Sequence, residues 1–244
     1  MQESVSKVIK LKKRITTQGF FEILDQVETG KVPAKLSKAY LQAVRFLQFE
    51  MRPLLSKLPE GFYGAEALAK YGFRDIPPPS QDCINFWNAN CKSTTHMAVY
   101  VPPTSLDEMN ERAQKTDAEY KTKLFISPYT DVQKLRPQKV EKGYWLILET
   151  DIKELNGNEE AHRATCPDSY ELPLTLDVVM CNLLLYVNTG KCLFGRNPYR
   201  YVRCHEKVSG TWNVVVGGFA PTELCVNYYA VYDDLGVVRA RKFR

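Results

Sequence analysis

An apolar segment from Leu174 to Val187 constrains the fold of this chain more than any other stretch. Its apolar residues cover nearly all faces of a helix rather than one stripe, and a helix of that kind is buried. We therefore predict a central core helix that ends near Gly190. The segment is interrupted by Asp177 and Asn182 and is shorter than the roughly 20 residues that a transmembrane helix needs, so we expect no membrane span.

Short runs rich in β-branched and aromatic residues predict strands around this helix. One polar helix lies among them, which Thr104 or Ser105 caps and which runs to about Lys121. Helices and strands mix without a strict βαβ alternation, which favours an α+β fold with a mixed or mainly antiparallel sheet. We expect the last two strands to form a hairpin across residues 233–236. The predicted strands are His96–Val101, Tyr144–Thr150, Trp212–Gly217, Leu224–Tyr232 and Gly236–Ala240.

Glycines and prolines delimit the remaining segments. Residues 61–73 predict a short helix between two glycines, and the prolines at 77–79 predict an extended segment. Residues 156–167 are polar and irregular, so we expect a loop. Gly217-Gly218 fits neither GxGxxG nor GxxxxGK[ST], so we expect a bulge or a turn and no phosphate site.

The first 60 residues differ from the rest in charge. They carry 11 Lys and Arg against 6 Asp and Glu, which accounts for the whole formal charge of +5 and leaves residues 61–244 neutral overall. Apolar residues at helical spacing predict one helix from Thr16 or Thr17 to Thr29 and a second from Ala34 to Arg52. The sequence therefore predicts an N-terminal helical region, 1–60, followed by an α+β domain, 61–244.

The cysteines indicate a reducing compartment. Their number is odd, no CxxC pair occurs, and no apolar signal segment opens the chain. We therefore expect reduced thiols in a cytoplasmic protein, with neither a metal site nor a cofactor. The seven are Cys83, Cys91, Cys166, Cys181, Cys192, Cys204 and Cys225.

The stretch GRNPYRYVR, residues 195–203, is the best candidate for a binding site. If residues 199–203 form a strand, Tyr199, Tyr201 and Arg203 share one face, because side chains alternate along a strand. Aromatic rings beside arginines can stack on bases or another flat ligand while a guanidinium contacts phosphate. The alternative is a tyrosine-rich sheet surface packed under a helix, with its arginines paired to acids. The candidate binding residues are Arg196, Tyr199, Tyr201 and Arg203.

A thiol nucleophile needs an imidazole in contact with it. Cys204 and His205 are strand neighbours that point to opposite faces, which leaves Cys204 with His96 as the open pairing. The alternative is that the thiols are buried and the imidazoles, including that of His162, face solvent. We assign no catalytic residue.

Asp177 lies inside the apolar helix, where a carboxylate needs a partner. Arg196 or Arg203 would supply one and make Asp177 part of a structural ion pair. The alternative is that Asp177 acts as a general base.

Several stretches, taken together and in this order, resemble an uncharacterised protein family of intracellular bacteria related to the chlamydiae, some members of which are joined to F-box-like interaction modules. They are GFYGAEALAKYGFRDIPPPS, THMAVYVP, GYWLILETDI, YELPLTLDVVMCNLLLYVNTGKCLFGRNPYRYVRC, VVVGGFAPTELCVN and GVVRARKF. The resemblance covers about residues 61–243, and the family has Trp-Thr where this chain has Tyr199-Arg200. It implies a bacterial origin and an interaction role near a eukaryotic host, and it transfers no catalytic residue.

Together these patterns predict a non-catalytic interaction module with an unknown protein partner, acting in the cytoplasm or, after delivery, on host components. The first alternative is single-stranded nucleic-acid binding through the Tyr/Arg surface, which the neutral charge of residues 61–244 disfavours. The second is a thiol-dependent hydrolase or transferase. A histidine beside Cys204 in a large cleft would favour the enzyme, and exposed Tyr199, Tyr201 and Arg203 beside a basic groove would favour nucleic acid.

Overall fold

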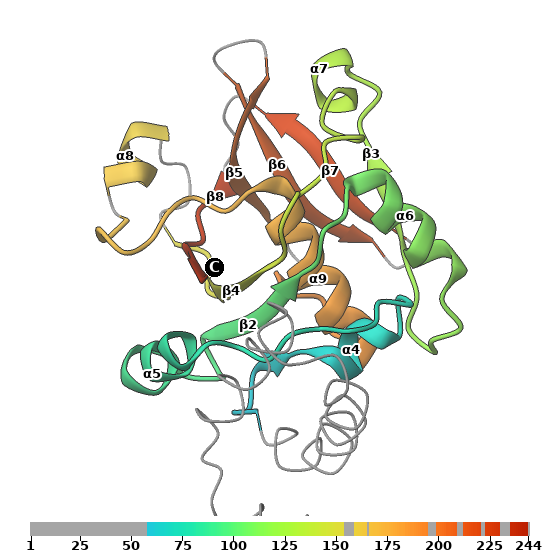
Figure 1. Cartoon of the computed structure of the whole chain (residues 1–244). Helices are drawn as coiled ribbons and strands as arrows, with labels where there is room; N and C mark the ends of the chain where they lie inside the picture. Colours follow the sequence, from blue (N-terminus) through green and yellow to red (C-terminus); the bar gives the residue numbers. More distant parts are fainter. Residues whose placement is uncertain are drawn as a thin grey trace, which may run out of the picture. The chain divides into compact units, whose positions relative to one another are not determined.

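A computed structural model describes residues 58–153, 159–164, 166–194, 199–208, 212–220, 223–229 and 235–243 (Figure 1). The two helices predicted between residues 16 and 52 lie outside these residues, as does the basic segment that precedes them. The N-terminal helical region and the domain boundary after residue 60 therefore stay predictions.

The described part has an α+β fold with six helices and two mixed sheets, as predicted. One sheet has the strand order β1-β2-β4-β9, and the other has the order β3-β7-β6-β5-β8. The elements are β1 (Phe62–Tyr63), α4 (Ala65–Ala69), α5 (Gln81–Asn90), β2 (His96–Val101), α6 (Leu106–Lys115), β3 (Lys123–Ile126), α7 (Thr130–Gln133), β4 (Tyr144–Glu149), α8 (Glu159–Ala164), α9 (Thr175–Thr189), β5 (Tyr201–Val208), β6 (Trp212–Ala220), β7 (Glu223–Tyr229), β8 (Leu235–Gly236) and β9 (Ala240–Phe243).

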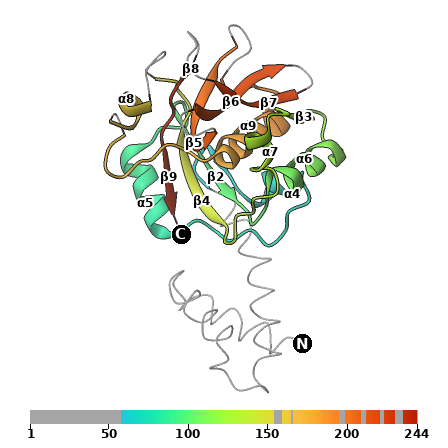
Figure 2. The ribbon, with the colours of Figure 1, turned by 90° about the horizontal axis from the view of Figure 1, so that it is seen from above.

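Helix α9 is the predicted central helix, and it lies between the two sheets (Figure 2). It contacts β2 of the first sheet and β5, β6 and β7 of the second, so 12 of its 15 residues are buried. Gly190 ends the helix in the left-handed conformation, with φ of 69°. A Cβ there would press against the Tyr120 ring, so glycine suits both the backbone and the packing.

The two central strands of the first sheet, β2 and β4, follow the sequence pattern closely. β2 and β4 pair antiparallel along their whole length, from His96 opposite Glu149 to Val101 opposite Tyr144. Both strands are buried over almost every residue, which fits their continuous apolar composition. Strand β9 pairs with the other edge of β4 and brings the C-terminal residues, including Lys242, beside the core.

Some predicted elements differ from the structure. The predicted loop 156–167 contains helix α8, and the polar helix capped by Ser105 ends at Lys115 rather than Lys121 because Thr116 turns to an extended conformation. Four further elements were not predicted: α5, β3, α7, and β1, which lies where a helix was predicted. The strand predicted at Gly236–Ala240 is divided between β8 and β9. Ser80 caps α5 by accepting a hydrogen bond from the Cys83 amide at 3.2 Å. A serine at this position is a typical helix N-cap, but it directly follows the proline segment and was not interpreted as one.

The predicted hairpin of the last two strands is wrong. β8 pairs parallel to β5, while both edges of β7 are occupied by β6 and β3. The strand after residue 234 therefore crosses to the opposite edge of the second sheet, beyond β5. In contrast, the bulge predicted at Gly217-Gly218 is confirmed by a register shift between Gly217 and Ala220. Gly218 has φ of 54°, and a Cβ on it would collide with the Tyr201 hydroxyl.

Candidate functional site

The predicted binding residues do not form one exposed face. Tyr199 precedes β5 and is exposed, Tyr201 is half-buried over Gly218, and Arg203 is 4% exposed. Arg196 lies outside the described residues. Arg203 is therefore an interior residue, and binding by the others stays a prediction.

Arg203 cross-links α8 to the second sheet. Its Nε donates to His162 Nδ1 at 3.1 Å and its Nη1 donates to Asn213 Oδ1 at 2.8 Å. The amide of Asn213 in turn donates to the Cys204 carbonyl at 3.1 Å. All three side chains are buried, so the prediction of a solvent-facing His162 in a loop is wrong. Because Nδ1 of His162 accepts a hydrogen bond, the N–H of its neutral imidazole is on Nε2.

Asp177 has a structural partner, but it is neither of the predicted arginines. Its Oδ2 lies 3.2 Å from Lys242 Nζ and accepts the Leu174 amide at 2.8 Å, while its Oδ1 accepts the Tyr144 hydroxyl at 2.5 Å. Arg203 cannot reach it, because Val202 and Cys204 flank Arg203 in β5 and point to the opposite face, toward α9. The ion pair thus joins α9 to the edge strand β9.

Two carboxylates converge on the N-terminal end of α9. Burial raises the pKa of Asp177, against the opposing influence of Lys242. Both oxygens of Glu206, from β5, accept the Thr175 amide at 2.9 Å, and burial raises the pKa of Glu206 as well. Carboxylates at this position are favoured by the helix dipole. Each makes a hydrogen bond to the backbone at the helix start, which favours a structural role.

Cys204, the candidate nucleophile, lies in the interior of the fold. It is fully buried, burial raises its pKa well above the usual value, and its Sγ lies 3.9 Å from the Val202 carbonyl. His96 instead shares a hydrogen bond of 2.9 Å with the Thr95 hydroxyl. All seven cysteines are free thiols, and burial raises the pKa of Cys91 to about 11 and of Cys83 to about 12. The thiols of Cys83 and Cys91 are therefore neutral at pH 7, whereas the thiolate is the reactive form of cysteine.

Three aromatic side chains lie together at the surface of the second sheet, and two of them are exposed. Tyr129 stacks on Tyr228 with ring centroids 4.3 Å apart at 29°, and Trp212 lies 5.6 Å from Tyr228 at 35°. We call Tyr129, Trp212 and Tyr228 the aromatic cluster. Together with Val208 it lines a cavity of about 260 Å³. Trp212 is 42% exposed and Tyr129 39%.

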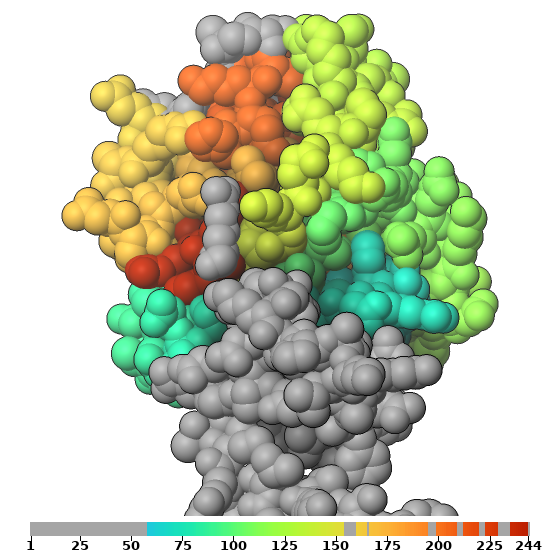
Figure 3. Space-filling view, in the orientation of Figure 1, coloured from blue at the N-terminus to red at the C-terminus, as the bar shows by residue number. Residues whose placement is uncertain are grey.

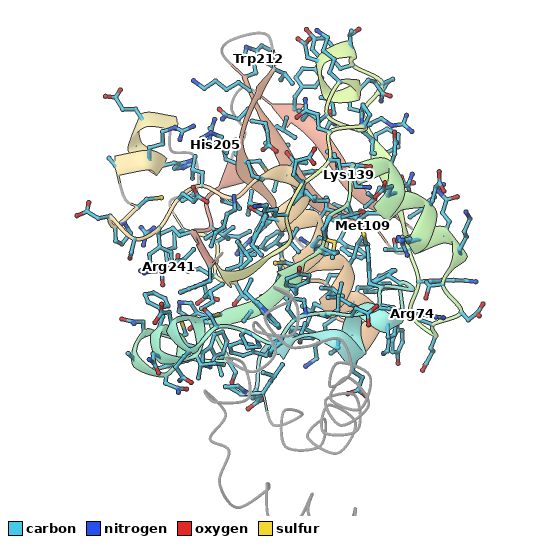
Figure 4. All side chains as sticks on the ribbon, viewed as in Figure 1. Arg74, Met109, Lys139, His205, Trp212 and Arg241 are labelled. Atoms are coloured by element: carbon cyan, nitrogen blue, oxygen red, sulfur yellow. The ribbon has the colours of Figure 1, made fainter. Side chains whose placement is uncertain are left out.

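The second sheet brings these rings together. Val208 is opposite Trp212 in the β5–β6 pair, and Val214 is opposite Tyr228 in the β6–β7 pair. Trp212 and Val214 are two residues apart on one strand, so Trp212 and Tyr228 are diagonal neighbours on one face. Figure 4 shows Trp212 near the end of the β5–β6 pair. In the space-filling view, the orange atoms of β5 and β6 adjoin the yellow-green atoms of α7 there (Figure 3).

Tyr129 reaches the cluster through a separate backbone anchor. The Ser127 amide donates to the Val226 carbonyl at 2.9 Å and extends the β3–β7 pairing by one residue. Tyr129 follows as the residue that begins α7, and its carbonyl accepts the Gln133 amide at 3.0 Å. The ring is thereby held beside Tyr228 at the end of β7.

The elements that carry the rings have mostly balanced charges. Lys134 pairs with Asp131 at 2.6 Å in α7, and Lys123 pairs with Glu223 at 3.6 Å across β3 and β7. On β5, Arg203 is buried, and Lys207 alternates with Val208 and points to the other face. The cluster is therefore not set in a basic groove.

A second cavity, of about 490 Å³, lies at the C-terminal end of α9 and is lined in part by α4. Asp117 and Glu119 supply negative charge there, and Lys70 offsets part of it. The Lys70 ammonium already donates to the Val187 carbonyl at 3.2 Å and so satisfies the carbonyl end of the helix, which favours cations. We assign this cavity no ligand.

Comparison with protein families, curated proteins and solved structures finds no match to this chain. Over the described ranges, no group of three or more His, Cys, Asp and Glu residues could hold a metal ion. Likewise, none of the helices in the part that the structure describes is long and apolar enough to cross a membrane.

Proposed function

We propose that this chain is a non-catalytic protein-interaction module and that the aromatic cluster is its contact surface. The observation that carries the proposal is the stack of Tyr129, Tyr228 and Trp212 around a surface cavity. Tyrosine and tryptophan are enriched in protein interfaces, because they combine a large apolar face with a polar edge. They are also enriched among the few interface residues that contribute most of the binding energy.

The buried polar residues support the same proposal. Arg203 and His162 bind α8 to the second sheet, and Asp177 and Lys242 bind α9 to β9. None of these four residues lines either cavity. Their partners account for their presence in the interior without a substrate, since buried polar groups need hydrogen bonds or opposite charges.

Binding of single-stranded nucleic acid is the second candidate. Tyr199 is exposed, and its ring could stack on a base. The burial of Arg203 removes the guanidinium that was expected to contact phosphate beside it. This candidate therefore depends on the basic residues near the start of the chain.

Affinity capture from a eukaryotic lysate tests the proposal when wild type and variants are compared by quantitative mass spectrometry. Trp212→Ala should lose the proteins that wild type captures, because it removes the most exposed ring of the cluster. Phe125→Ala is the matched control: Phe125 is 41% exposed but lies on the opposite face of the second sheet. Equal capture by wild type and Trp212→Ala would refute the aromatic cluster as the contact surface.

A further inference from the structure

We propose that the aromatic cluster binds an uncharged, extended, proline-rich segment of its partner protein. This inference rests on the proposed function and adds the chemistry of the bound segment. Three features carry it: the arrangement of the rings, the hydrogen-bond donors of Trp212 and Tyr228, and the paired charges on the neighbouring elements.

The ring arrangement favours a ligand that lies across the cluster. Tyr129 and Tyr228 already stack at 4.3 Å, so no flat ligand can enter between them. Trp212 continues the row at 35° to Tyr228. The cavity of about 260 Å³ is smaller than the roughly 300–1,000 Å³ of typical small-molecule sites. A shallow row of rings of this size matches the aromatic-lined grooves that hold polyproline helices.

The donors of the cluster complement a polyproline backbone. The Trp212 indole N–H and the Tyr228 hydroxyl make no hydrogen bond within the described residues. A polyproline helix has no internal hydrogen bonds, so its carbonyls are free to accept from such donors. The chain contains one such pairing inside its own fold, where Trp145 Nε1 donates to the Pro77 carbonyl at 3.1 Å within the extended segment 77–79.

The charge of the surroundings disfavours the other occupants. Lys134 and Lys123 are paired with Asp131 and Glu223. On β5, Arg203 is buried, and Lys207 points to the face opposite Val208. A nucleic-acid strand draws its affinity from several cationic contacts to phosphates. A proline-rich segment needs none, and its stiff backbone loses little entropy on binding.

The test is a titration of the full chain with a ten-residue polyproline peptide, followed by NMR of the indole N–H signals. Trp212 is the exposed tryptophan of the three, since Trp87 and Trp145 are each 4% exposed. The Trp212 signal, identified through Trp212→Phe, should shift on binding, and the other two should stay in place. Quenching of fluorescence by acrylamide should fall at the same peptide concentrations.

Variants and probes separate the possible outcomes. Tyr228→Ala should weaken peptide binding at least tenfold, Trp212→Phe should weaken it less because a ring remains, and Phe125→Ala should leave it unchanged. A circular dichroism spectrum and melting curve for each variant will show whether it folds. A Gly-Ser peptide of equal length should give no shift.

Absence of a Trp212 shift at millimolar polyproline peptide would overturn the inference. If lysate capture still depends on Trp212 in that case, the proposed function stands and only the nature of the segment is wrong. A shift with a thymidine decamer but not with polyproline would overturn both, because the cluster would then be a nucleic-acid surface.

Discussion

At the scale of single residues, the core depends on one lysine to balance a buried carboxylate. Lys242 Nζ lies 3.2 Å from Asp177 and 3.0 Å from Glu171, and Asp177 is fully buried. Without Lys242, Asp177 keeps the Tyr144 hydroxyl and the Leu174 amide, neither of which is charged. We expect Lys242→Met to lower the free energy of unfolding at pH 7 by about 3–5 kcal/mol, the usual loss when one partner of a buried pair is removed.

The size of this loss should depend on pH. Burial raises the pKa of Asp177 in the folded state above the ordinary 3.8. Protonation of Asp177 therefore stabilises the folded state below pH 3.8, and this contribution is lost as pH rises through the pKa that Asp177 has in the folded state. Lys242 opposes that rise, so the folded pKa is higher still in Lys242→Met. The difference from wild type should be small near pH 3.5 and should grow as pH rises to 7.

Urea melts across that pH range check this prediction. Lys139→Met is the control, because Lys139 pairs with Glu108 at the surface and such pairs contribute little. Equal destabilisation by Lys242→Met at both ends of the range would mean that Asp177 is not the group affected.

At the scale of elements, helix α9 allows a test with two adjacent leucines. Leu184 is fully buried between the sheets, whereas Leu185 is half-exposed. Leu184→Ala should cost about 2–5 kcal/mol through lost burial and a cavity, and Leu185→Ala should cost clearly less. Urea melts of both variants provide the measurement, and similar losses would contradict the placement of α9 at the centre of the fold.

The elements that could be predicted are those whose pattern is local. The uniform apolar sequence of α9 and the apolar, β-branched sequences of β2 and β4 indicate by themselves that these elements are buried. The bounds of all three were predicted to within a few residues. Helix α8 was not predicted, because it is short and polar. Its buried residue, His162, accepts a hydrogen bond from Arg203, which lies on a strand distant in sequence. Local sequence does not contain that contact.

At the scale of the whole molecule, the candidate site depends on contacts that the sequence does not reveal. Tyr129, Trp212 and Tyr228 come from three separate segments, and they meet only because β6 and β7 pair in one register and β3 joins the edge of β7. The partner of Asp177 was misassigned for the same reason, since Lys242 reaches it through the pairing of β9 with β4. Alternation did predict that Tyr201 and Arg203 would share a face, but not that α8 would cover Arg203.

The distribution of charge over the whole chain leads to a last prediction, on nucleic acid. Residues 61–244 are neutral overall, and the excess of +5 lies in residues 1–60, where Lys10, Lys12 and Lys13 are close together. Any affinity for single-stranded DNA should therefore be electrostatic and should fall steeply with salt, because each neutralised phosphate releases a counterion. In fluorescence anisotropy with a labelled thymidine 20-mer at about 50 mM salt, where screening is weak, replacement of these three lysines by glutamine should remove most of the binding. Tyr199→Ala is the informative counterpart: the Tyr199 ring is exposed, but Arg203, which was expected to contact phosphate next to it, is buried, so we expect no change. A contribution that persists at high salt and disappears in Tyr199→Ala would show instead that the Tyr/Arg stretch binds bases.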